Sequence, residues 1–215
     1  MLPPGLPKPL AQVAGRPFLD WLLGSLARQG IERCILSVGY GAEAIVAHCG
    51  ARHCNMPIEY CAEEVPLGTG GAIRRALALA REPQVLVLNG DTWLGASYRT
   101  MLEAHRAARA RLSIACVRVP ETGRYGRVVI KDGIVVAFAE KGARGSGVIN
   151  GGSYVIDRNA LSGTPDGAFS FESDYLVPRI AELQPAAFMV EDSFLDIGIP
   201  EDLARAQALL PCVAA

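Results

Sequence analysis

The stretch Gln84-Val85-Leu86-Val87-Leu88-Asn89-Gly90-Asp91 decides the fold class of this chain. Residues 85–88 are all apolar, which is typical of a strand buried on both faces, as in the centre of a parallel sheet. A glycine-containing turn follows the strand and places Asp91 beyond its carboxyl end. Ligands of open α/β sheets bind at this end of the strands. The stretch therefore predicts a central strand and, directly after it, a functional carboxylate.

Strand and helix patterns alternate on both sides of this stretch. On the N-terminal side we expect helices at 17–30, 42–47 and 72–80 and strands at 34–38 and 57–61. On the C-terminal side we expect a helix at 97–110, a strand at 112–119, a hairpin at 128–136, a strand at 151–156, a helix at 172–183, a strand at 187–190 and a helix at 200–210. This order predicts an α/β fold with a doubly wound, mixed and mostly parallel sheet of Rossmann-like type, carrying a small antiparallel lid.

Length and composition narrow the class of protein. The 215 residues are 50% hydrophobic, and 21 Lys and Arg residues balance 22 Asp and Glu residues to a net charge of −1. We expect a single domain, and we expect no nucleic-acid partner, because nucleic-acid binding requires a basic excess. No apolar run reaches the ~18–20 residues of a membrane span, and the first residues do not resemble a signal peptide. The expected location is the cytoplasm, and the sequence leaves open whether the chain forms a homo-oligomer.

Two carboxylates are candidate ligands of a hard cation. Asp91 follows the central strand, and Asp196 follows a short apolar segment just before a helix that begins at Pro200. Mg²⁺ prefers oxygen ligands, and two aspartates that share one ion would suit phosphoryl or nucleotidyl transfer. For Asp91 the alternative is an ordinary Asx turn at the strand end.

Two further segments suit phosphate binding. Lys8 lies between Pro7 and Pro9, which predicts an extended segment that presents its ammonium group. The run Gly68-Thr69-Gly70-Gly71 precedes the expected helix at 72–80 and would let a ligand approach free N–H groups of the backbone. The alternatives are a solvated lysine and a plain tight turn.

Polar residues of the C-terminal half suit a phosphorylated sugar. Glu140 and Lys141 follow the expected hairpin, and Asn150 precedes Gly151 and Gly152. The lysine could pair with a phosphate and the asparagine could bind sugar hydroxyls, although exposed Glu-Lys pairs are also common on ordinary surfaces.

Four possible zinc ligands lie close together in sequence: His48, Cys49, His53 and Cys54. Adjacent residues tend to point in different directions, so we favour a helix end with buried thiols over a zinc site.

In this order, the motifs resemble the sugar nucleotidyltransferase family, which joins a sugar 1-phosphate to a nucleotide and releases pyrophosphate. The resemblance covers nearly the whole chain and rests on Leu6-Pro7-Lys8-Pro9, Pro66–Ala72, Asn89-Gly90-Asp91, Tyr125–Val128, Glu140-Lys141, Asn150-Gly151-Gly152 and Leu195–Gly198. The segments 7–11, 15–19, 169–172 and 196–202 are most similar to the D-glycero-α-D-manno-heptose 1-phosphate guanylyltransferases, which make GDP-heptose for bacterial capsule and surface-layer polysaccharides.

The resemblance implies a role for each candidate. Asp91 and Asp196 would hold Mg²⁺, Lys8 would steady the phosphates of GTP, and Lys141 would bind the sugar phosphate. The base and ribose would lie against Gly68, Thr69 and Gly70, and the sugar against Gly126, Glu140, Asn150, Gly151 and Glu172. Residues 1–120 would thus form a nucleotide-binding half and residues 121–215 a sugar-phosphate-binding half of one domain.

The resemblance leaves three points open. Family members begin with an apolar strand and a G-x-G-T-R loop that cradles the triphosphate, and neither precedes Leu6, so either the sequence is incomplete or this form lacks the element. Mannose 1-phosphate or another hexose 1-phosphate is an alternative substrate. A binding subunit without catalysis is the alternative of another class.

Two glutamates are candidates for the residues that select guanine over other bases. Guanine presents two adjacent donors, N1–H and N2–H₂, which an ionised carboxylate can accept. Glu64, with Glu63 as second candidate, lies just before the Gly68 turn. A carboxylate there would also repel the acceptor edge of a pyrimidine; the alternative is that backbone groups read the base.

Overall fold

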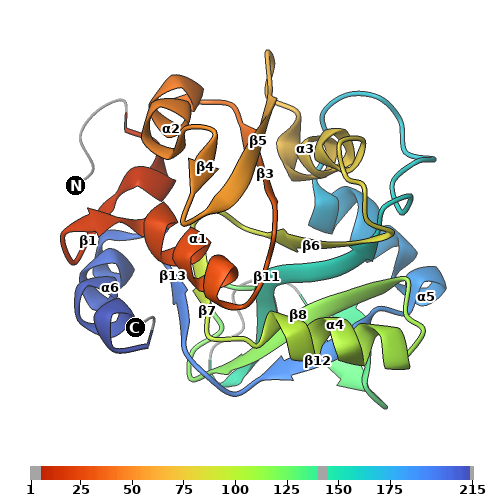
Figure 1. Cartoon of the computed structure of the whole chain (residues 1–215). Coiled ribbons are helices and arrows are strands. Elements are labelled where there is room, and N and C mark those ends of the chain that lie inside the picture. Colours follow the sequence, from red (N-terminus) through yellow and green to blue (C-terminus); the bar gives the residue numbers. More distant parts are fainter. Residues whose placement is uncertain (1–5, 140–144, 214–215) are drawn as a thin grey trace. The chain divides into compact units, whose positions relative to one another are not determined.

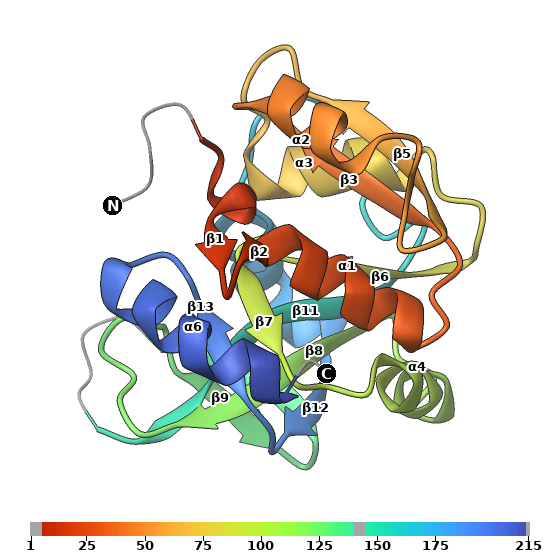
Figure 2. The same cartoon turned by 60° about the vertical axis from the view of Figure 1, so that its left-hand side comes forward.

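The computed structural model describes residues 6–139 and 145–213, and these fall into two compact units (Figures 1 and 2). Unit 1 comprises the described residues up to Pro66, together with Gly90–Trp93 and the described residues from Leu195 on. Unit 2 comprises Leu67–Asn89 and the described part of Leu94–Phe194. The halves expected at 1–120 and 121–215 are a functional division, which stays a prediction.

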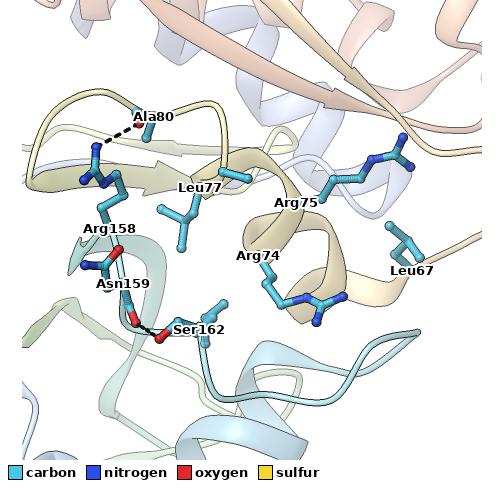
Figure 3. Close-up of a pocket in the computed structure, with 10 residues that line it drawn as sticks. Leu67, Arg74, Arg75, Leu77, Ala80, Arg158, Asn159 and Ser162 are labelled. Carbon is cyan, nitrogen blue, oxygen red and sulfur yellow. Dashed lines mark hydrogen bonds between the residues drawn. The ribbon is translucent and has the colours of Figure 1, made fainter.

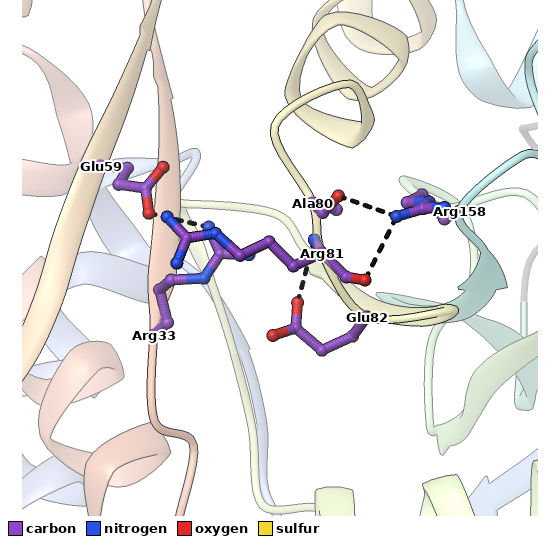
Figure 4. A network of polar contacts seen from close by, with 6 residues as sticks. All are labelled: Arg33, Glu59, Ala80, Arg81, Glu82 and Arg158. Atoms are coloured by element: carbon purple, nitrogen blue, oxygen red, sulfur yellow. Dashed lines mark hydrogen bonds and ion pairs between the residues drawn. The ribbon is translucent and has the colours of Figure 1, made fainter.

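Unit 1 contains a parallel strand pair and three α-helices. In chain order its elements are the 3₁₀ turn Lys8–Leu10, β1 (Gln12–Val13), β2 (Arg16–Pro17), α1 (Phe18–Arg28), β3 (Cys34–Val38), α2 (Ala42–Cys49), β4 (Arg52–His53), β5 (Met56–Ala62) and α6 (Pro200–Val213). β3 pairs in parallel with β5, which also pairs with β4 in a hairpin. The ion pair between Arg33 and Glu59 (2.8 Å) joins the start of β3 to β5 (Figure 4).

The core of unit 1 brings together distant parts of the sequence. Val13, Phe18 and Trp21 pack with Ala206 and Leu210 of α6, the blue helix of Figure 2. Trp21 also donates a hydrogen bond from its indole to the carbonyl of Val13 (2.9 Å). The N-terminal and C-terminal segments therefore form one core.

Unit 2 is built on a six-stranded sheet in the order β6-β11-β8-β12-β10-β9. Its elements are α3 (Gly68–Leu77), β6 (Gln84–Leu88), α4 (Tyr98–Ala107), β8 (Leu112–Val119), β9 (Val128–Lys131), β10 (Ile134–Phe138), β11 (Gly147–Asp157), a π-helical turn (Phe171–Leu176), a 3₁₀ turn (Val177–Arg179), α5 (Ile180–Leu183) and β12 (Ala186–Val190). The amphipathic helix α4 packs on this sheet and contacts β8, β11 and β12 (Figure 1). Two further short strands, β7 (Thr92–Leu94) and β13 (Phe194–Asp196), pair with each other, and all of their residues except Leu94 and Phe194 belong to unit 1.

The sheet confirms a mixed α/β fold, but the strand directions differ from the expectation. β8 and β12 run parallel, as do β3 and β5, whereas β11 runs antiparallel to both of its neighbours. β6 is also not the central, doubly buried strand that the sequence predicted: it lies at the edge of this sheet, and its five residues are half-buried. An apolar run indicates which side chains avoid water, but it shows neither the position of a strand in its sheet nor the direction of its neighbours. The hairpin β9–β10 is present with its turn at Asp132 and Gly133, both at positive φ, and it extends the edge of this sheet.

Two helices differ from their predicted bounds. α3 begins at Gly68 rather than at residue 72 and ends at Leu77, so the glycine run forms its first turn. The segment that follows α3 is held by Arg158, whose guanidinium donates to the carbonyls of Ala80 and Arg81 (Figure 4). The helix expected at 172–183 is split into three short segments, because Pro178 lacks the N–H that would continue the α-helical hydrogen bonds.

Candidate active site

Asp91 and Asp196 are held next to each other in unit 1 by the backbone. Asp91 lies in the turn before β7, and Asp196 is the last residue of β13, the partner of β7. The N–H of Ile197 donates to the carbonyl of Asp91 (3.0 Å). The N–H of Gly198 donates to Oδ1 of Asp196 (2.8 Å), which orients that carboxylate. The structure thus brings together the two aspartates that the sequence singled out.

The electrostatics of the pair suit a cation. Burial raises the pKa of Asp91 above its ordinary value, the negative charge of Asp196 raises it further, and the ammonium group of Lys8 lowers it in part. A bound positive ion stabilises the ionised form of a carboxylate whose charge is otherwise disfavoured. Because the donors are carboxylate oxygens, this set fits Mg²⁺.

Lys8 differs from the predicted extended conformation. It opens a 3₁₀ turn, with extended backbone only at Pro7, and its side chain is exposed. Pro9 lies 3.6 Å from the position of a Cβ on Gly90, so the lysine turn packs beside the turn that carries Asp91. Proline restricts φ without preventing a turn, which is why the extended expectation was wrong.

In unit 2, Asn150 lies at the centre of a hydrogen-bond network. Its Nδ2 donates to the hydroxyl of Tyr154 (2.7 Å) and to Oε2 of Glu172 (2.8 Å), and its Oδ1 accepts from the N–H of Gly152 (3.0 Å). The register of β11 shifts between Asn150 and Tyr154, and Gly152 at φ +70° lies within this irregularity. A Cβ on Gly151 would lie 3.0 Å from the carbonyl of Ala115. The network orients the half-buried carboxylate of Glu172, which has further capacity to accept hydrogen bonds.

The sequence did not single out Tyr154. Its ring packs edge-on against Phe171, the neighbour of Glu172, with centroids 5.1 Å apart. Burial raises the pKa of its hydroxyl well above the ordinary value, so it remains a neutral partner of Asn150. A signal was available, since residues four apart in a strand share a face.

The glycine run of α3 contacts its own chain rather than an open cradle. A Cβ on Gly70 would collide with the ring of Phe169, and one on Gly68 would lie 2.6 Å from the carbonyl oxygen of Phe169. The N–H of Gly70 donates to that carbonyl (2.9 Å), and Oγ1 of Thr69 accepts from Phe171 (2.9 Å). These contacts explain why positions 68 and 70 are occupied by glycine. Nucleotide binding by Gly68, Thr69 and Gly70 stays a prediction.

The remaining predicted residues are placed as follows. Gly126 lies before β9, and a Cβ there would lie 3.2 Å from the carbonyl of Ala139. Glu140 and Lys141 lie outside the described residues. Glu63 accepts a hydrogen bond from Ser37 (3.3 Å), whereas Glu64 is exposed.

His48, Cys49 and His53 are brought together in unit 1, which differs from the expectation that adjacent residues diverge. One candidate ligand atom from each lies within 4.8 Å of the others, and Cys54 is outside this group. The expected helix end with a buried thiol is also present, because Cys49 ends α2 and is 2% exposed.

A cavity of about 580 Å³ in unit 2 contains none of the predicted site residues (Figure 3). Its lining includes Arg74 and Arg158. Arg74 pairs with Asp166, and Arg158 binds the segment that follows α3, so both guanidinium groups have structural roles. We assign no ligand to this cavity.

Among the helices that the structure describes, none is long and apolar enough to cross a membrane.

The family is decided by a comparison with family models, in which residues 2–211 match the nucleotidyl transferase model. The chain belongs to the nucleotidyl transferase family. This nucleotidyl transferase is 39% identical over 203 residues to the D-glycero-α-D-manno-heptose 1-phosphate guanylyltransferase of Aneurinibacillus thermoaerophilus, covering 94% of this chain and 88% of the relative. It is 34% identical over 199 residues to the enzyme of the same name from Campylobacter jejuni, covering 92% and 87%.

The solved structures agree with the family assignment. The crystal structure of HddC from Yersinia pseudotuberculosis complexed with GMP-PN is 36% identical, with a TM-score of 0.87 over 94% of this nucleotidyl transferase and 89% of HddC.

Proposed function

We propose that this chain is a guanylyltransferase that joins GTP and D-glycero-α-D-manno-heptose 1-phosphate to give GDP-heptose and pyrophosphate. The observation that carries the proposal is 39% identity, over 94% of the chain, to a relative with that activity in its name. The product is an activated sugar for bacterial capsule or surface polysaccharide. Because GTP is a substrate, we place the reaction in the cytoplasm.

The chemistry requires charge screening and alignment more than proton transfer. A phosphate oxygen of the sugar phosphate attacks the α-phosphorus of GTP, and the bond from that phosphorus to the bridging β-phosphate oxygen breaks. The nucleophile is already an anion, so no general base is needed. Mg²⁺, when bound, supplies positive charge to the phosphates. Asp91 and Asp196 would hold that ion, and Lys8 would add a fixed positive charge.

Residues of unit 2 would bind the sugar. The carboxylate of Glu172, oriented by Asn150, is suited to accept hydrogen bonds from sugar hydroxyls. We assign Gly126, Glu140, Lys141 and Gly151 to the same substrate, with Lys141 at its phosphate.

The Asp91→Asn and Asp196→Asn variants test the proposal through release of pyrophosphate from GTP, Mg²⁺ and the heptose phosphate. We expect each to lose roughly 100-fold or more of turnover, and the double variant little beyond that, because one ion depends on both carboxylates. Glu201→Gln is the matched control, since Glu201 is an exposed carboxylate in the first turn of α6.

Two outcomes would contradict the proposal. Near-normal turnover of Asp91→Asn would exclude its role as an ion ligand. Faster turnover with mannose 1-phosphate, which lacks the extra carbon of the heptose, would assign the other sugar.

A further inference from the structure

A cluster of nitrogen and sulfur donors lies in unit 1 among residues that we have given no part in the reaction. His48 and Cys49 belong to the last turn of α2, and His53 lies in β4. One candidate ligand atom from each of the three lies within 4.8 Å of the others. The chain turns sharply between them at Gly50 (φ +59°), which brings the β4–β5 hairpin back onto the end of α2.

Asp20 provides a second, independent observation. Its Oδ1 lies 2.5 Å from Nε2 of His48 and 3.1 Å from Nε2 of His53, so one carboxylate oxygen contacts both imidazoles. Asp20 lies in the first turn of α1 and its side chain is only 17% exposed. A carboxylate that holds an imidazole through a ring nitrogen is the arrangement usually found around metal-binding histidines.

Cys54 is directed elsewhere by the backbone. It lies at φ +49° and Asn55 at φ +62°, which are the two central positions of the β4–β5 turn. Its Sγ lies 3.9 Å from the position of a Cβ on Gly24, in α1. The turn conformation therefore separates Cys54 from the group that contains its neighbour His53.

We propose that His48, Cys49 and His53 bind one zinc ion, with Asp20 as the residue that orients the two imidazoles. Two imidazole nitrogens and one thiolate form a donor set that zinc prefers, whereas Mg²⁺ would require oxygens. Donor atoms around a tetrahedral zinc ion lie ~3.3–3.6 Å apart, so the three candidate atoms, which lie within 4.8 Å of one another, would move closer together to hold the ion. The ion would join α1, the end of α2 and β4, and its role is to stabilise unit 1.

Metal analysis of the purified full-length chain tests this proposal. After equilibration with zinc in buffer containing excess Mg²⁺ and removal of unbound metal, we expect one zinc ion per chain. Cys49→Ser and His53→Ala should lose it, and Asp20→Asn should weaken zinc binding by about 10–100-fold. Cys54→Ser is the matched control and should keep the ion, as should Asp91→Asn.

Two further measurements do not depend on catalysis. Thermal unfolding of the wild-type chain should shift upward by about 5–10 °C with zinc at 100 times its dissociation constant, and Cys49→Ser should not respond. With Co²⁺ in place of zinc, a thiolate-to-metal charge-transfer band should appear, and it should be missing in Cys49→Ser.

Comparison of each variant with and without zinc separates loss of the ion from loss of folding. A wild-type chain that retains no zinc and whose melting temperature does not respond would overturn the proposal. Equal loss of zinc in Cys54→Ser and Cys49→Ser would overturn the assignment of its ligands.

Discussion

Asp91 illustrates what a single residue's surroundings decide. Burial and the neighbouring Asp196 both disfavour its charged form, and Lys8 offsets only part of this effect. A strand-end aspartate could be recognised in the sequence, but its carboxylate partner lies 105 positions later in the chain. Only the pairing of β7 with β13 and the hydrogen bond from Ile197 to Asp91 bring the two together.

We predict that one exposed residue, Glu64, sets the preference of the enzyme for guanine over pyrimidine bases. If Glu64 accepts from the N1–H and N2–H₂ groups of guanine, Glu64→Gln should reduce the preference for GTP over UTP by roughly 10-fold, the effect of one charged hydrogen bond. The measurement is relative turnover with GTP, UTP and dTTP. Glu63→Gln is the comparison, because Glu63 is already bound by Ser37. An unchanged preference in both variants would assign base choice to the backbone.

Packing between elements accounts for the glycines at the start of α3. Gly70 is buried, and the ring of Phe169 occupies the space that a Cβ would need. The sequence showed a glycine-rich helix start, but it did not show that a segment about 100 residues later fills the space beside it.

We expect Gly70→Ala to destabilise the protein by about 1–3 kcal/mol, because it overpacks a close contact. Gly163→Ala is the matched control, since a Cβ there meets no atom within 4 Å and the change should be nearly neutral. Thermal or denaturant unfolding provides the measurement. Equal stability of the two variants would show that the contact with Phe169 yields easily.

His105 links α4 to β8 and predicts a pH dependence. It is 1% exposed, its Nδ1 bonds to Oγ of Ser113 (2.9 Å), and its Nε2 has no hydrogen-bond partner among the described residues. Burial lowers its pKa, the charge of Asp157 opposes this, and Arg106 adds to it. The folded state therefore keeps the imidazole neutral below the ordinary value of 6.5, where the unfolded chain binds a proton.

Stability contributed by this group is present above pH 6.5 and falls as the pH drops from there towards the lowered folded pKa. The loss is at most about 1.4 kcal/mol per pH unit, or about 3–6 °C in melting temperature per pH unit. We expect His105→Asn, whose amide can still reach Ser113, to unfold with a shallower dependence on pH between 7.5 and 5.5. The same slope in both proteins would exclude His105 as the cause.

The core of unit 1 includes side chains of α6. Leu210 of α6 is fully buried against residues from the start of the chain, such as Val13 and Phe18. Leu210→Ala should therefore lower stability by about 2–5 kcal/mol and the melting temperature by about 5–15 °C. Cys212→Ala, at an exposed position of the same helix, should change it by less than about 2 °C. Comparable melting temperatures for the two variants would show that α6 contributes little to this core.

The sequence alone determined the type and order of most elements and the family to which the chain belongs. It also singled out Asp91 and Asp196 as candidate ion ligands. These are local or ordered properties: apolar periodicity, turn residues and motif order are all readable along one chain. His48, Cys49 and His53 were also visible in the sequence, but because adjacent residues tend to point in different directions, the sequence argued against a shared zinc site.

Tertiary structure decided which residues are neighbours. The antiparallel direction of β11, the network from Tyr154 through Asn150 to Glu172, and the meeting of Asp20 with His48 and His53 depend on contacts between distant segments. Side-chain patterns report which residues avoid water, but they do not report which partner covers a residue or how completely it is buried, as the half-buried residues of β6 show. That choice is made when the elements pack, and it determines where the chemistry of this chain can take place.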